Sequence, residues 1–563
     1  MSTSSSRIAL ERPRRRRAVI AAAIAACVGL AGLVGATAPV AQADDTPAFQ
    51  NQSLPFDVRA ADMVSRMTWQ EKVGQLRSAN SPSSNPADPQ YQAIPRLGII
   101  AYRYWNEALH GVVGVTGATS FPSALGIGST WNRALVKEMG TAIGDEARAG
   151  QNTGSGNGLT YWSPTINLNR DPRWGRADES YGEDPYLMGE IGKQFVSGAQ
   201  SGDPTYTKIV STPKHYFANN AENYRRNGDS VLSERALREY YTPAFAELIG
   251  ADGSASRSFM TSYNRINGVP ASASTFAIET LARRTWGFDG FTTSDCDAIL
   301  DEHQRHLWEP EELGGRSITA AEATAWSLKA GTDLACDNGN WAQQYVGNVD
   351  AARNQGLITE ADVDVVLLRV FTERMRLGEF DDASKVRYRG TDYRTQAIGA
   401  NSAVHTSIAN QMADEAPILL KNEPVTGTAD NALPLTAADA DDVVLVGYMG
   451  TEAVLGGYSG SPSPAPVTPL TGLTQAVKSF SPSASVTQID GITPKYGAKP
   501  GVRGVTFADA NNTTTFTSTP PPQARNAVWD WLGWQGIQYD PVDSYPTAMM
   551  PNQDWGGMFS ITT

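Results

Sequence analysis

Histidine and cysteine are scarce in this sequence of 563 residues, which contains 5 histidines and 3 cysteines. Neither residue type forms the clusters that hold zinc in proteins, so the sequence predicts no metal site, and nothing in it calls for an organic cofactor. Basic residues are outnumbered, with 46 Lys and Arg against 59 Asp and Glu and a formal net charge of −13. That balance argues against a nucleic-acid partner, because binding phosphates requires a basic face.

Long apolar runs are also few, and only the one at residues 18–34 approaches the length of a membrane span. Arg14 to Arg17 precede this run, and the small-x-small sequence at residues 41–43 follows it. The pattern predicts a signal peptide over residues 1–43, and hence a secreted chain that has no membrane segment after cleavage. An uncleaved anchor is the alternative, but the run is short, is interrupted by Gly29 and Gly32 and is followed by Gly35. Cleavage would remove six arginines and one glutamate, which lowers the net charge from −13 to −18.

Short apolar segments alternate with helical patterns between residues 55 and 381. The strand-like segments are residues 158–168, 208–212, 258–262, 290–294 and 330–335. Strands that alternate with helices favour a parallel sheet. Polar or charged residues follow each segment, as they do at the carboxyl ends of the strands in a (β/α)8 TIM-like barrel. We therefore predict such a barrel, with a doubly wound open sheet as the alternative.

The remaining chain predicts a second and smaller unit. Residues 382–402 are polar and are interpreted as a linker, and residues 403–503 as an incomplete α/β sandwich domain with a helix near residues 406–415 and a strand at residues 443–446. Residues 504–563 combine a Thr/Pro-rich tract with several tryptophans and tyrosines. We interpret them as a tail or as the start of an inserted module.

One strand-like segment delivers a carboxylate that could act as a nucleophile. Residues 290–294 end directly before Asp295, where a side chain can face a pocket. A carboxylate is the usual nucleophile at a glycosidic carbon, because it traps an oxocarbenium-like centre as a glycosyl ester. An Asp at a strand end is by itself weak evidence, since it is more often a cap or an ion-pair partner.

Three further stretches strengthen this interpretation. Residues 212–218 place Lys214 and His215 next to each other at another strand end, where they could bind neighbouring sugar hydroxyls. Residues 169–176 place arginines among aromatic residues, and residues 105–111 set a carboxylate beside a tryptophan. Combinations of carboxylates and aromatic rings suit sugars, which stack on one face and form hydrogen bonds at the edge.

Together these stretches resemble glycoside hydrolase family 3, over about residues 55–473. The blocks that carry the resemblance are residues 66–72, 171–185, Lys214–His215, Ser294–Asp295, 433–435 and 455–460. The resemblance implies a retaining enzyme that hydrolyses β-linked sugars from a non-reducing end, with an oligosaccharide as its partner and Asp295 as its nucleophile. The residues implied to bind the terminal sugar are Glu107, Arg176, Lys214, His215 and Tyr263, with Trp105 beside them.

The same blocks look like the β-xylosidase branch of the family. Family members that take glucose often have Asp where Glu107 stands, and the longer Glu would fill the space of the sugar's C6 group. We also predict a disulfide between Cys296 and Cys336, which would wall the pocket at that position. A β-glucosidase or an α-L-arabinofuranosidase is the alternative within the family, and a cell-wall scaffold has little support because no repeat or anchor follows the leader.

A retaining mechanism also needs a general acid, and none is recognisable here. After residue 450 the only carboxylates are Glu452, Asp490, Asp509, Asp530, Asp540, Asp543 and Asp554. None lies in a string that resembles the family's acid/base loop. We therefore expect a chain that is truncated before that loop, or a sugar-binding homologue without catalytic activity. Linkage preference and oligomeric state do not follow from the sequence.

Overall fold

The computed structural model describes residues 46–78, 92–154, 158–390, 393, 402–424, 431–437, 439–440, 443–446, 448–462 and 465–489, and the strands β10 (Pro494–Lys495) and β11 (Gly504–Val505). The predicted signal peptide and almost all of the predicted tail lie outside these residues, so both stay predictions. Within the described ranges, no helix is both long and apolar enough to cross a bilayer.

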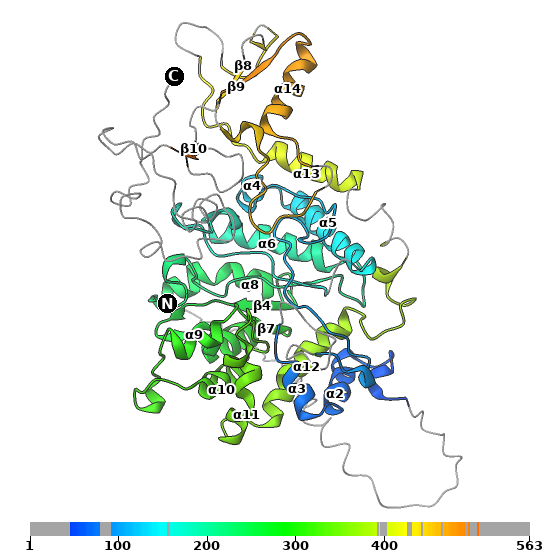
Figure 1. Ribbon diagram of the computed structural model, residues 1–563, viewed down its shortest axis with the longest axis vertical. Helices are drawn as coiled ribbons and strands as arrows, with labels where there is room; N and C mark the ends of the chain where they lie inside the picture. The colour runs from blue at the N-terminus through cyan, green and yellow to red at the C-terminus, as the bar shows by residue number, and fades with distance from the viewer. Residues whose placement is uncertain are drawn as a thin grey trace, which may run out of the picture. The chain divides into compact units, whose positions relative to one another are not determined.

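A series of parallel pairings runs through the first 340 residues. Strand β1 (Thr160–Tyr161) pairs in parallel with β2 (Val210–Ser211), and β4 (Ser258–Thr261) pairs in parallel with β7 (Phe291–Ser294). Isolated parallel bridges join the remaining neighbours, namely Thr165 with Lys214, Tyr216 with Thr261, Thr293 with Leu334, and Arg77 with Ala335. The chain is thus a mixed α/β protein whose neighbouring parallel segments largely follow chain order, as the alternating pattern predicted (Figure 1).

Helices connect and flank these strands (Figure 1). Their bounds are α2 (Phe56–Ser65), α3 (Trp69–Gly74), α4 (Ala124–Ser129), α5 (Arg133–Asn152), α6 (Pro185–Gln200), α7 (Glu234–Ala236), α8 (Pro243–Ile249), α9 (Ala298–Gln304), α10 (Ala320–Ala330), α11 (Tyr345–Asn354) and α12 (Glu360–Arg376). Shorter elements include η3 (Ala177–Glu179), η4 (Glu222–Tyr224), η5 (Leu237–Tyr241), η7 (Phe276–Thr285), β3 (Asp229–Ser230), β5 (Arg265–Ile266) and β6 (Val269–Pro270).

Local sequence signals account for two of these helices. A capping box between Thr68 and Glu71 opens α3, as the sequence predicted, and a second box between Thr359 and Asp362 opens α12. The buried face of α12 includes Val363, Val366, Leu367, Val370 and Phe371, which repeat with helical spacing. Both helices are therefore specified locally and then held by burial of one face.

One predicted strand is shorter than expected. Helix α10 extends to Ala330, and Gly331 ends it in the left-handed region at φ 99°. Within the run at residues 330–335, Leu334 and Ala335 form parallel bridges with Thr293 and Arg77. The end of this run therefore joins the parallel series, as predicted, and its first residue belongs to the preceding helix.

Residues 403–489 contain the predicted helix and strand. Helix α13 (Ala403–Glu415) begins three residues before the predicted start, and strand β8 (Val443–Val446) has the predicted bounds. Strand β8 pairs in parallel with β9 (Val486–Ile489), and α14 (Pro469–Phe480) lies between them in the chain. Part of the predicted linker is packed, because Val386 and Tyr388 are buried against Tyr206.

Candidate active site

Asp295 lies where the buried strand β7 ends, and its surroundings are polar and closed. The residue is 8 % exposed, and the backbone N–H of Cys296 donates a hydrogen bond to the carboxylate Oδ1 at 2.8 Å. Within the described residues, its Oδ2 accepts no hydrogen bond. Burial raises the pKa of Asp295, while the charges of Arg225 and Arg176 oppose that rise. One oxygen is thus fixed, and the other points toward His215.

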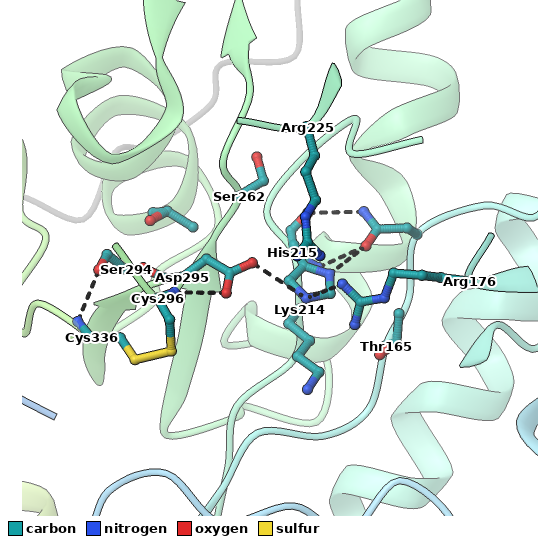
Figure 2. Close-up of polar contacts among 12 residues, drawn as sticks. Thr165, Arg176, Lys214, His215, Arg225, Ser262, Ser294, Asp295, Cys296 and Cys336 are labelled. Carbon is teal, nitrogen blue, oxygen red and sulfur yellow. Dashed lines mark hydrogen bonds and ion pairs between the residues drawn. A yellow bond between two sulfur atoms is a disulfide. The ribbon is translucent and has the colours of Figure 1, made fainter. Parts of the chain in front are cut away.

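Neutral His215 lies beside that free oxygen, with its Nε2 3.6 Å from Asp295 Oδ2 (Figure 2). Burial and the nearby cations Arg176 and Lys214 hold the pKa of His215 well below its ordinary value, so this contact is not an ion pair. Arg176 Nη1 donates to His215 Nε2 at 3.0 Å. Because an arginine can only donate, Nε2 carries no proton, and the ring proton is on Nδ1.

Asn167 determines this tautomer and was not predicted. Its Oδ1 lies 2.9 Å from His215 Nδ1 and accepts that proton, and it also accepts the backbone N–H of His215 at 2.9 Å. Its Nδ2 donates to the backbone carbonyl of His215 at 2.9 Å. One of these hydrogen bonds holds the ring and two hold the backbone of His215, so the Nε2 lone pair points toward Arg176.

Arg176 is held in turn by Glu179, the last residue of η3. Arg176 Nε donates to Glu179 Oε1 at 2.9 Å, and Arg176 Nη2 donates to Oε2 at 2.5 Å. Both side chains are almost fully buried. The Arg176 charge lowers the pKa of Glu179 against the effect of burial, so this bidentate pair is ionised.

Lys214 and Glu107 form a second buried pair. Lys214 Nζ donates to both carboxylate oxygens of Glu107 at 2.8 Å, and Trp105 Nε1 donates to Oε1 at 3.1 Å. The Trp105 ring stacks on that of Trp162, with centroids 5.4 Å apart and planes 10° apart. The three residues predicted at this side of the pocket thus lie together.

Tyr263 also lies in the site, after strand β4. The guanidinium groups of Arg225 and Arg226 lie 4.9 Å and 5.3 Å from the centre of its ring. Burial and the Asp295 charge raise the pKa of Tyr263, so the phenol keeps its proton. Its backbone carbonyl is 2.8 Å from His306 Nε2, which fixes the backbone at the strand end.

The predicted disulfide is present. Cys296 and Cys336 are bonded, with their Cα atoms 4.4 Å apart, and Figure 2 shows the bridge on the opposite side of Asp295 from His215. The two cysteines belong to a buried cluster with Trp162 and Met260, against which Trp105 packs. The bridge therefore shares one wall with the Trp105 side of the pocket.

Four residues of the site escaped sequence reasoning for different reasons. Arg225 follows η4 in a polar loop and resembles any solvated arginine. Asn167 and Glu179 lie within predicted stretches but act through their neighbours. Tyr458 comes from the second unit, and its ring centre is 4.4 Å from Lys214 Nζ. Only the block at residues 455–460 marked that segment as notable.

The carboxylates weighed as general acids stay open. Glu452 is the only one of the seven in the described part of the chain, and the others, from Asp490 onward, lie outside it. Among the described residues, no group of three or more His, Cys, Asp or Glu side chains is placed to hold a metal ion.

Comparison with known proteins identifies the family. Residues 90–372 match the glycosyl hydrolase family 3 N-terminal domain, and this chain belongs to that family. The sequence is 35% identical over 453 residues to β-D-xylosidase 3 of Arabidopsis thaliana, covering 77% of this chain and 53% of the plant protein. It is 35% identical over 451 residues to a β-xylosidase/α-L-arabinofuranosidase of Medicago sativa subsp. varia, covering 76% and 53%. The chain thus spans about half the length of these curated relatives.

Solved structures agree with the family. An exo-β-xylosidase of glycoside hydrolase family 3, in complex with a xylobiose aziridine probe, has a TM-score of 0.67 and 30% identity and covers 81% of this chain and 55% of that one. A β-glucosidase from Erythrobacter marinus has a TM-score of 0.65 and 25% identity, covering 87% and 65%. Proteins of similar fold are thus named for different sugars, xylose in one case and glucose in the other.

Proposed function

We propose that this protein is a retaining exo-glycosidase that releases β-linked xylose from xylo-oligosaccharides, with Asp295 as the nucleophile. The observation that carries the proposal is the buried Asp295 carboxylate, which has one oxygen fixed by a backbone N–H and the other without a hydrogen bond among the described residues. Its second oxygen points toward His215 and lies among the charges of Arg225, Arg176 and Lys214. A carboxylate with one oxygen free of hydrogen bonds suits attack at a sugar carbon.

The surrounding charges suit this role. Arg225 and Arg176 favour the ionised form of Asp295, which must be a carboxylate to attack. Burial removes the water that would otherwise solvate the nucleophile. The paired side chains of Lys214 and Glu107 and the Nε2 atom of His215 offer donors and acceptors for the hydroxyls of the terminal sugar, as the family resemblance implies.

The choice of sugar rests on one wall of the pocket. Glu107, Trp105 and the Cys296–Cys336 bridge lie together, and the family resemblance implies that a C6 group would require this space. Xylose lacks that group, and the relatives named above include enzymes named for xylose and arabinose. The similar β-glucosidase keeps glucose as the alternative substrate.

The architecture and location are proposed with the function. We propose that the parallel segments close into a (β/α)8 barrel over residues 55–381, joined by residues 382–402 to a partial α/β sandwich at residues 403–503. The series of parallel bridges from Arg77 to Thr165 supports the barrel. We further propose that residues 1–43 direct secretion, which the basic and apolar pattern supports.

The test is hydrolysis of activated aryl glycosides by the full chain. A 2,4-dinitrophenyl β-xyloside needs no general acid in the first step, so dinitrophenolate should be released and the xylosyl group transferred to Asp295 even if the acid is absent. Water then hydrolyses the xylosyl ester, slowly where no general base assists, and the first sugar product by NMR should be β-xylose. Asp295→Asn should abolish turnover, whereas Asp289→Asn, an exposed carboxylate before the same strand, should not. Faster cleavage of the glucoside would overturn the choice of sugar. An inert chain that still binds xylose would favour the sugar-binding alternative.

A further inference from the structure

Residues 455–461 of the second unit lie directly against the proposed sugar site. Ser459 forms a parallel bridge with His110, Ser461 forms one with Thr116, and the backbone N–H of Gly117 donates to the carbonyl of Ser461 at 2.9 Å. We call residues 455–461 the docking segment. Backbone bridges of the kind that join neighbouring strands therefore hold it against residues 110–117.

Two glycines make that approach possible. A Cβ on Gly111 would lie 2.4 Å from the Thr119 carbonyl oxygen and 2.6 Å from the nitrogen of Gly460. A Cβ on Gly460 would lie 2.6 Å from the same carbonyl oxygen. Backbone therefore meets backbone at this seam, and any side chain at either position would push the docking segment away.

His110 packs between the docking segment and a neighbouring loop. Its Nδ1 lies 2.9 Å from the carbonyl oxygen of Phe121, and its Nε2 lies 2.9 Å from the carbonyl oxygen of Gly457. Burial lowers the pKa of His110, so the neutral ring has one N–H and donates to one of these two carbonyls at a time. The ring is 2 % exposed and fills the space between that loop and the residue that precedes Tyr458.

Tyr458 is the side chain that this seam presents to the pocket. Its backbone has φ 54°, a conformation that an L-residue adopts only when its surroundings hold it there. Its half-buried ring lies over Lys214 Nζ, and its phenol pKa is raised by burial and by the carboxylates Glu107 and Glu179. The ring therefore stands among the charges that surround the proposed sugar position.

We propose that Tyr458 forms a wall of the pocket for the terminal sugar and that His110 is a positioning residue that acts through it. This inference rests on the proposed function, because it names a further contact of the same site. The ring excludes water from the Lys214–Glu107 pair and offers an apolar face to the C–H groups of a pyranose.

The test measures inactivation by 2,4-dinitrophenyl 2-deoxy-2-fluoro-β-xyloside, with calorimetric xylose binding as a readout that needs no chemistry. Tyr458→Ala should raise the inhibition constant and the xylose dissociation constant about tenfold, while the maximal inactivation rate changes little. Tyr458→Phe keeps the ring and should stay within about twofold. Tyr186→Ala, at a tyrosine 73% exposed on α6, is the matched control.

The double variant separates positioning from general damage. His110→Ala should weaken binding about as much as Tyr458→Ala, and the two together should be no worse than Tyr458→Ala alone. Gly460→Ala should have the same effect as His110→Ala, and the half-buried His303→Ala should have none. Additive losses would overturn the positioning role, and wild-type affinity in Tyr458→Ala would overturn the wall. If wild-type protein binds xylose but is never labelled, the proposed catalysis fails while the affinities still decide the wall. If it does neither, both are overturned.

Discussion

Removing the Cys296–Cys336 bridge should destabilise the fold by a calculable amount. The bridge joins residues 40 positions apart, and closing a loop of that length in the unfolded chain is worth about 4 kcal/mol. If roughly 330 residues unfold as one unit, that change lowers the melting temperature by about 6 °C. Alanine at both positions leaves no thiol that could react. Because both cysteines are almost fully buried, the substitution also changes little of the solvent-exposed surface.

The assay is guanidinium unfolding of the double variant Cys296→Ala/Cys336→Ala beside the wild-type protein, followed by tryptophan fluorescence. Thiol alkylation of the unreduced wild-type chain should find both cysteines blocked. Wild-type protein unfolded in reductant should match the double variant. A difference below about 1 kcal/mol, or two alkylated thiols in the wild-type protein, would refute the reasoning.

Three further outcomes follow from buried polar contacts. Asn167→Ala frees the His215 ring and should slow labelling of the nucleophile about tenfold with unchanged circular dichroism, and an unchanged rate contradicts it. Glu107→Gln leaves the Lys214 ammonium buried beside a neutral amide and should lower the free energy of unfolding by about 3 kcal/mol in urea titrations. An unchanged free energy of unfolding would contradict an ionised pair. Burial raises the pKa of Glu373 from 4.5 to about 7. The stability that comes from its bound proton is therefore complete below pH 4.5 and is lost as the pH rises to 7. Glu373→Gln should flatten the dependence of the free energy of unfolding on pH over this range, and an unchanged dependence would contradict the raised pKa.

Sequence patterns predicted the parts of the fold that depend on neighbours along the chain. Capping boxes and helical spacing specify α3 and α12, and β8 has the predicted bounds. The strand predicted at residues 330–335 begins too early, because Ala330 still belongs to α10, whereas Leu334 and Ala335 pair in parallel as predicted. An apolar alanine suits a buried helix as well as a strand, so the pattern alone could not place the boundary.

Sequence reasoning could predict only the site residues whose position along the chain indicates their role. Asp295, Lys214 and His215 follow strands, so their position in the sequence predicted that they would converge. Asn167 acts by fixing the tautomer of His215, and the two side chains meet only once distant parts of the chain have folded together. Tyr458 approaches Lys214 because residues 459–461 pair with residues 110–117. That pairing depends on the close approach of Gly111 and Gly460 rather than on any local pattern.

The most direct test of the account is the site of covalent labelling by the 2-fluoro xyloside. Its leaving group departs without a general acid, so a competent nucleophile is trapped as a glycosyl ester whether or not the acid is present. Peptide mass spectrometry should find a single fluoroxylosyl group on Asp295, absent from Asp295→Asn and present in Asp289→Asn. Label on another carboxylate, or none on a chain that still binds xylose, would contradict the assignment of Asp295.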